Sequence, residues 1–207
     1  MRLIVEKSKN INVGHPLDPD TVVGPVIHPV HEKKVLDYIK IGEEEGANIA
    51  IGGQKVAGPG GGCYISPTLF TNATNDMRIS QEEIFGPILP VLTYSNESEL
   101  EPIIDSFERP LGFYIFSKRK KFIKEMFQRY SYGGGVANDT MIQFANDRLP
   151  FGGVGHSGMG AYHGQHSFDA FTHFKPFIKR GTWTDPFVRY APYPTSFNWL
   201  KKLLNLI

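Results

Sequence analysis

The chain has 207 residues, of which 41% are hydrophobic and 13% aromatic, and this composition predicts a soluble globular protein with a real core. Its formal net charge of +1 argues against nucleic acid as a partner, because phosphate recognition needs a basic surface. The single cysteine excludes an intramolecular disulfide, and the lack of an apolar signal region or a membrane-length apolar run favours a cytoplasmic protein.

Helical and strand-like segments alternate along most of the chain. The first twelve residues carry Leu-Ile-Val without a capping signal and fit the end of a helix. The predicted elements then follow in order: a helix over 29–45, a strand over 47–51, a glycine-rich turn over 54–62, an extended segment over 64–70, a strand over 88–94, a helix over 97–107, a strand over 111–116, a helix over 119–130 and a strand over 136–138. This alternation predicts an α/β fold built on a parallel sheet.

The stretch over 149–168, LPFGGVGHSGMGAYHGQHSF, is the densest in glycine. Six of the thirteen residues from Gly152 to Gly164 are glycine, which predicts tight turns or close backbone approach. We expect a rigid loop lining a site, anchored by four apolar or aromatic residues: Phe151, Met159, Tyr162 and Phe168. Gly153–Gly158 matches G-x-G-x-x-G, but Pro150 before it and more glycines after it argue against a dinucleotide-binding turn.

Three segments form an ordered set of motifs: QEEIFGP over 81–87, GGVANDT over 134–140 and LPFGGVGHSGMGAYHGQHSFDAFTH over 149–173. Together they resemble motifs of the aldehyde dehydrogenases. The last is similar to the C-terminal signature of the class 3 and coniferyl aldehyde dehydrogenase branch, while the turn-rich connector over 13–21 is more like that of the general enzymes. The resemblance runs from about Gly14 to Lys179 and implies oxidation of an aldehyde to a carboxylic acid with NAD or NADP.

Glu83 and Phe85 are the candidate cofactor-binding residues. The resemblance implies that Glu83 holds the nicotinamide ribose and that Phe85 positions the ring for hydride transfer. A carboxylate can accept hydrogen bonds from both ribose hydroxyls, and side chains two residues apart in an extended segment share a side. The residues alone favour another interpretation, in which Glu83 belongs to a surface helical turn and Phe85 to the core. The resemblance reverses that preference.

Asn138 and Phe151 are the candidate substrate-side residues. By resemblance, Asn138 supports the substrate site and Phe151 lines the aldehyde tunnel. The alternatives are a structural Asx turn for Asn138 and a core phenylalanine beside a turn for Phe151.

Cys63 does not match the family's nucleophile. It lies in GGGCYISP, without the G-Q-x-C sequence that surrounds the catalytic cysteine in the family, so we interpret it as structural. We expect no metal site either, because His163, His166 and His173 lack the thiolates and the spacing of zinc sites. No residue of the chain is therefore predicted to be catalytic.

The resemblance also predicts how the chain is organised. In the family the nucleophile, the general base and the phosphate-binding glycine loop lie upstream of the connector. We therefore expect a C-terminal portion, with 1–169 as part of the catalytic domain and 170–207 as an oligomerisation strand and tail. Such a chain should be inactive alone and should form a homodimer or pair with a missing N-terminal half. The alternative is a non-catalytic oligomerisation or interaction remnant.

Two segments of the tail are candidates for contacts between molecules. AFTHFKPFIK over 170–179 is predicted to pair as a strand across a subunit boundary. The amphipathic segment over 197–207 suits a helix on anionic lipid or a helix docked on a partner subunit. We favour docking, because two lysines give only weak attraction to a membrane surface.

Overall fold

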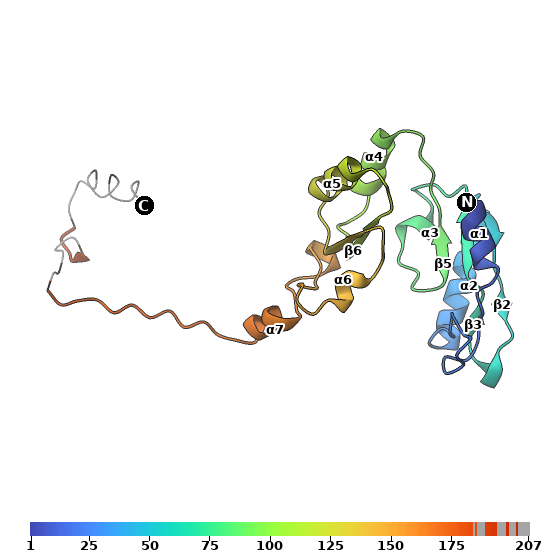
Figure 1. The fold of residues 1–207 in the computed structure, drawn as a ribbon, viewed down its shortest axis with the longest axis horizontal. Helices are drawn as coiled ribbons and strands as arrows, with labels where there is room; N and C mark the ends of the chain where they lie inside the picture. Colours follow the sequence, from blue (N-terminus) through green and yellow to red (C-terminus); the bar gives the residue numbers. More distant parts are fainter. Residues whose placement is uncertain (184, 186–188, 194–197, 199–201, 203–207) are drawn as a thin grey trace.

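The computed structural model describes residues 1–183, 185, 189–193, 198 and 202. Figure 1 shows two bodies joined by a connection after β5, followed by a segment that runs away from both bodies beyond α7. Within the described residues, no helix is long and apolar enough to cross a membrane.

The first body packs a long helix on a small mixed sheet. Its elements are α1 (Arg2–Ser8), α2 (Pro29–Glu44), β1 (Asn48–Ile51), β2 (Lys55–Val56), the short 3₁₀ turn Pro59–Gly61, β3 (Tyr64–Ile65), β4 (Thr68–Thr71), α3 (Arg78–Gln81) and β5 (Ile88–Pro90). The sheet order is β1-β4-β5, with β1 antiparallel and β5 parallel to the central β4, and β2 and β3 form a separate antiparallel pair.

Local sequence explains where α2 begins and ends. His28 is its N-cap and accepts a hydrogen bond from the backbone N–H of His31 at 3.1 Å, and Pro29 occupies the first turn, where a missing N–H costs nothing. Gly46, with φ of 101°, follows the last turn and allows the left-handed exit that stops helices. The buried face of α2 meets the sheet and α3 through a cluster that includes Val35, Tyr38, Ile39, Ile65, Phe70, Ile79 and Ile84.

The second body is a β-α-β unit with short helices around it. Its elements are the 3₁₀ turn Glu97–Glu99, α4 (Leu100–Asp105), β6 (Gly112–Ile115), α5 (Lys120–Arg129), β7 (Gly134–Ala137), α6 (Ile142–Ala145), the 3₁₀ turn Gly155–Ser157 and α7 (Gly164–Ala170). β6 and β7 are parallel, and Gly112 pairs with Gly134 at the start of the register. The rings of Phe113, Phe127 and Tyr132 pack together, with centroids 5.3–6.0 Å apart.

The α/β class is confirmed, but the prediction of one parallel sheet is wrong. The described part of the chain forms a mixed three-strand sheet and two two-strand sheets, and β1–β4 and β2–β3 are antiparallel. The reason lies in the connections. Parallel neighbours need a long crossover, which α5 supplies between β6 and β7, whereas only the β2–β3 hairpin joins β1 to β4. The predicted turn over 54–62 accordingly contains β2.

The predicted strand over 170–179 is absent from the single chain. Ala170 is the last residue of α7, so the expected boundary between 169 and 170 falls inside that helix, and residues 173–180 form no helix or strand. Pairing across a subunit boundary stays a prediction, because a strand is defined by the neighbour it pairs with. The amphipathic segment over 197–207 lies outside the described residues, apart from two isolated positions.

Candidate functional site

The loop between α3 and β5, residues 83–87, carries the candidate cofactor residues. Ile84 is buried in the core, while Glu83 and Phe85 on either side of it are exposed. Phe85 is 81% exposed and has φ of 57°, a conformation that a bulky residue adopts only under strain. The alternative that placed Phe85 in the core is therefore wrong, and α3 ends at Gln81, before Glu83.

Three residues on one face of α2 contact the backbone of the 83–87 loop. The Nε2 atom of His31 lies 2.7 Å from the carbonyl oxygen of Phe85, and the Nζ atom of Lys34 lies 3.5 Å from that of Glu83. Val35 leaves no room for a side chain at Gly86, where a Cβ atom would lie 2.7 Å from a Val35 methyl group. Sequence reasoning missed these contacts, since His31 and Phe85 are 54 residues apart.

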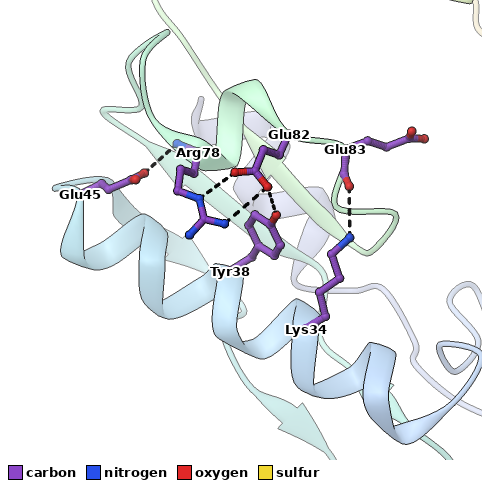
Figure 2. Close-up of polar contacts among 6 residues, drawn as sticks. All are labelled: Lys34, Tyr38, Glu45, Arg78, Glu82 and Glu83. Atoms are coloured by element: carbon purple, nitrogen blue, oxygen red, sulfur yellow. Dashed lines mark hydrogen bonds and ion pairs between the residues drawn. The ribbon is translucent and has the colours of Figure 1, made fainter.

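Glu82 and Glu83 are adjacent carboxylates with different surroundings, as Figure 2 shows. Glu82 accepts hydrogen bonds from the guanidinium of Arg78, at 2.7 Å from Nε, and from the hydroxyl of Tyr38. The backbone N–H of Arg78 in turn donates to Glu45 at 2.8 Å. This group of side chains joins α2 to α3.

The two donors stabilise the charged form of Glu82. The Arg78 guanidinium, followed by the Tyr38 hydroxyl, lowers the pKa of Glu82 from 4.5 to about 2. The same hydrogen bond, together with burial, raises the pKa of Tyr38. Glu82 is thus a structural anion at neutral pH.

This contact is expected to lose its contribution to stability in acid. Because the pKa of Glu82 is lower in the folded state, the contribution is complete above pH 4.5 and declines as the pH falls toward about 2. Thermal unfolding of the wild type and Glu82→Gln should therefore give Tm values that converge over that window. Glu44→Gln, at an exposed position of α2, serves as the control and should track the wild type. A Tm difference that stays constant with pH would contradict the assignment.

Glu83 has a free carboxylate by comparison. Figure 2 shows its side chain directed away from Arg78 and Tyr38, and only its backbone carbonyl is contacted, by Lys34. Among the residues that the structure describes, none donates a hydrogen bond to the Glu83 carboxylate. Its oxygens are available to accept hydrogen bonds from a ligand.

Asn138 joins the ends of the two parallel strands of the second body. Its side-chain oxygen accepts from the backbone N–H of Ser117 at 2.8 Å, and its own N–H donates to the carbonyl of Ile115 at 2.8 Å. Its φ of 60° is one that asparagine tolerates. The side chain thus holds the segments after β6 and β7 together, while its support of a substrate site stays a prediction.

Phe151 lies in a group of four rings at the start of the glycine-rich loop. It pairs with Tyr162 through two backbone hydrogen bonds of 3.0 Å, and its half-buried ring packs edge-on against Phe144 and Tyr162 and stacks on His163, with centroids 5.0–5.9 Å apart. Two of the predicted anchors are wrong for this chain, because Met159 is 99% and Phe168 61% exposed. Only a three-residue 3₁₀ turn begins at Gly155, so the G-x-G-x-x-G match opens no helix.

The four candidate residues lie in two places. Glu83 and Phe85 belong to the first body, and Asn138 and Phe151 belong to the second. Cys63 is buried and its carbonyl accepts a hydrogen bond from the N–H of Val26 at 2.9 Å, as a packing residue would.

Comparisons with known proteins place the chain in a family. The model of the aldehyde dehydrogenase family matches residues 1–177. The chain is 47% identical over 138 residues to 4,4'-diaponeurosporen-aldehyde dehydrogenase of Staphylococcus aureus, with 67% of this chain and 30% of that protein covered. It is 42% identical over 182 residues to aldehyde dehydrogenase family 3 member A2 of Rattus norvegicus, with 86% and 36% covered.

Solved structures agree with these relatives. The NAD+ complex of an aldehyde dehydrogenase from Bacillus cereus matches with a TM-score of 0.76 and 30% identity, over 83% of this chain and 34% of that one. An NAD-dependent aldehyde dehydrogenase from Sinorhizobium meliloti matches with a TM-score of 0.80 and 29% identity, over 89% and 37%. The chain thus spans about a third of the length of the proteins it matches. It belongs to the aldehyde dehydrogenase family.

Proposed function

We propose that this chain is the C-terminal portion of an NAD(P)-dependent aldehyde dehydrogenase that oxidises an aldehyde to a carboxylic acid. The observation that carries the proposal is the 83–87 loop, which presents a free carboxylate and an exposed ring two residues apart. Bound NAD or NADP would supply the hydride acceptor. Solved relatives include an NAD+ complex, which supports this choice of cofactor.

The residues of the loop fit a nicotinamide riboside by their chemistry. The Glu83 carboxylate can accept hydrogen bonds from the two ribose hydroxyls, while Glu82 is already occupied by Arg78 and Tyr38. The outward ring of Phe85 offers an apolar face against which a flat heterocycle can pack. In this proposal Glu83 binds the ribose, and Phe85 orients the nicotinamide ring.

The second body contributes the substrate side in this proposal. Phe151, with Phe144 and Tyr162, forms an apolar wall suited to the carbon chain or ring of an aldehyde. Asn138 keeps the adjoining strand ends together. The thiolate nucleophile and the general base would come from a part of the enzyme outside these 207 residues, because Cys63 is buried.

A second candidate is an oligomerisation or interaction module of the same fold. It is favoured by the apolar side chains after α7, which are 68–94% exposed: Phe171, Phe174, Phe177 and Ile178. In either case we propose that this segment covers its apolar surface on a second copy of the chain or on an N-terminal half. The two candidates differ in whether the adjacent coding sequence encodes a G-Q-x-C segment.

Glu83→Gln tests the proposed role in the enzyme expressed together with its upstream portion. Losing a charge-assisted bond to the ribose should slow single-turnover hydride transfer by about tenfold. The thermal midpoint should hardly change, because the carboxylate makes no contact within the described part of the fold. Stopped-flow measurement of cofactor reduction gives the rate.

Glu82→Gln is the matched control for this measurement. It makes the same carboxylate-to-amide replacement at the neighbouring residue. Because Glu82 contacts Arg78 and Tyr38, this change should lower the thermal midpoint and leave hydride transfer near the wild-type rate. Unaltered hydride transfer in Glu83→Gln would remove Glu83 from the cofactor site.

A further inference from the structure

The backbone at Phe85 is held in a conformation that its side chain disfavours. With φ of 57°, the Cβ atom of Phe85 crowds its own backbone, and a chain free to relax would leave this region. Such strain persists only where surrounding contacts impose it. The contacts that impose the strained conformation of Phe85 therefore also direct its ring outward.

Packing of the ring does not impose this conformation. The side chain is 81% exposed, and its one ring neighbour among the described residues is His31, edge-on with centroids 6.5 Å apart. Ile84 fixes the residue before it in the core, and the contact of Gly86 with Val35 fixes the residue after it. Between Ile84 and Gly86, the carbonyl oxygen of Phe85 makes a polar contact of its own.

The His31 ring makes that contact. Its Nε2 atom lies 2.7 Å from the Phe85 carbonyl oxygen. A carbonyl oxygen only accepts, so the imidazole must donate from Nε2, and both the neutral Nε2–H form and the protonated form can do so. The backbone N–H of His31 is separately used by the His28 cap, which fixes the start of the helix that carries the ring.

We propose that His31 is a positioning residue, which holds Phe85 in the left-handed conformation that points its ring at the nicotinamide. Lys34, one turn further along α2, assists through its longer 3.5 Å contact with the Glu83 carbonyl. This inference rests on the proposed function of the 83–87 loop. The first turns of α2 then set the geometry of hydride transfer without touching the cofactor.

The first test uses the 207-residue chain and no cofactor. In hydrogen–deuterium exchange, His31→Ala should raise exchange by about fivefold at the amides of Thr68 and Ile88, which donate to the carbonyls of Pro87 and Gly86 at 2.8 Å. Loss of the His31 contact should loosen the loop that carries these two acceptors. His31→Gln should restore protection, because its amide nitrogen can take the place of Nε2 and donate to the same carbonyl. Unchanged exchange in His31→Ala would overturn the proposal that His31 holds Phe85 in place.

A matched control separates this effect from general damage to α2. Lys33→Ala removes an exposed side chain that pairs with Asp37, next to the Lys34 that reaches the loop. This control should leave exchange at the Thr68 and Ile88 amides unchanged, and an effect equal to that of His31→Ala would overturn the proposal.

The second test uses the enzyme expressed with its upstream portion. His31→Ala should slow single-turnover hydride transfer by about fivefold with little change in cofactor affinity, and His31→Gln should recover the rate. Slow transfer in Phe85→Ala beside normal transfer in His31→Ala would overturn the positioning role alone. Normal transfer in both Phe85→Ala and Glu83→Gln would instead overturn the proposed function of the loop.

Discussion

The purified 207-residue chain is expected to leave NAD and NADP unreduced with any aldehyde. Aldehyde oxidation in the proposed mechanism needs a thiolate that can reach the substrate, and the only thiol here, Cys63, is 9% exposed and held beside Val26. Absorbance of the reduced cofactor, followed with short aliphatic and aromatic aldehydes, should stay at the uncatalysed background.

Adding the upstream portion of the enzyme provides the positive control for this cofactor-reduction assay. If the chain is part of an enzyme, activity should appear when the two portions are expressed together, and Cys63→Ala should leave that activity intact. If the chain is an interaction module, the combined protein should remain inactive while still assembling. Cofactor reduction by the 207-residue chain alone, abolished by Cys63→Ala, would contradict both the prediction and the structural interpretation of Cys63.

Helices α2, α4 and α5 were predictable because their signals are local, whereas the short helices α3, α6 and α7 were not predicted. Pro29 and Gly46 mark the ends of α2, and the predicted bounds differ from the structure by one residue. Strand direction was not predictable in the same way. Whether β1 runs with or against β4 depends on the hairpin between them, and the two-residue strands β2 and β3 are too short to show a periodicity.

The candidate site was predictable only in part. Glu83 and Phe85 could be selected from a resemblance in seven adjacent residues, but the contacts that hold them come from His31 and Lys34, about fifty residues earlier. Residue type also misled at Met159, since an apolar side chain is buried only if another surface covers it. Such contacts exist only in the folded chain.

The glycine-rich loop shows two different physical demands for glycine. A Cβ atom on Gly153 would overlap the backbone carbonyl of Ser157, and one on Gly152 would overlap that of Gly160, so these positions need glycine for close approach. A Cβ atom on Gly155 would meet no other atom within 4 Å, but the residue has a φ of 65°, so this position needs glycine for its conformation alone. The sequence predicted a need for glycine without separating the two.

Gly153→Ala is therefore expected to be far more damaging than Gly155→Ala. The overlap at Gly153 involves backbone atoms, which cannot rotate away, so the loop must move; a cost of about 3 kcal/mol is expected, at the upper end for overpacking. Gly155→Ala should cost about 1 kcal/mol, the strain of one left-handed residue. Urea unfolding of the chain gives both free energies, and exchange at the Phe151 and Tyr162 amides, which pair across the loop at 3.0 Å, should rise in Gly153→Ala alone. Equal costs at the two positions would mean that the backbone of the loop does not pack as closely as this geometry requires.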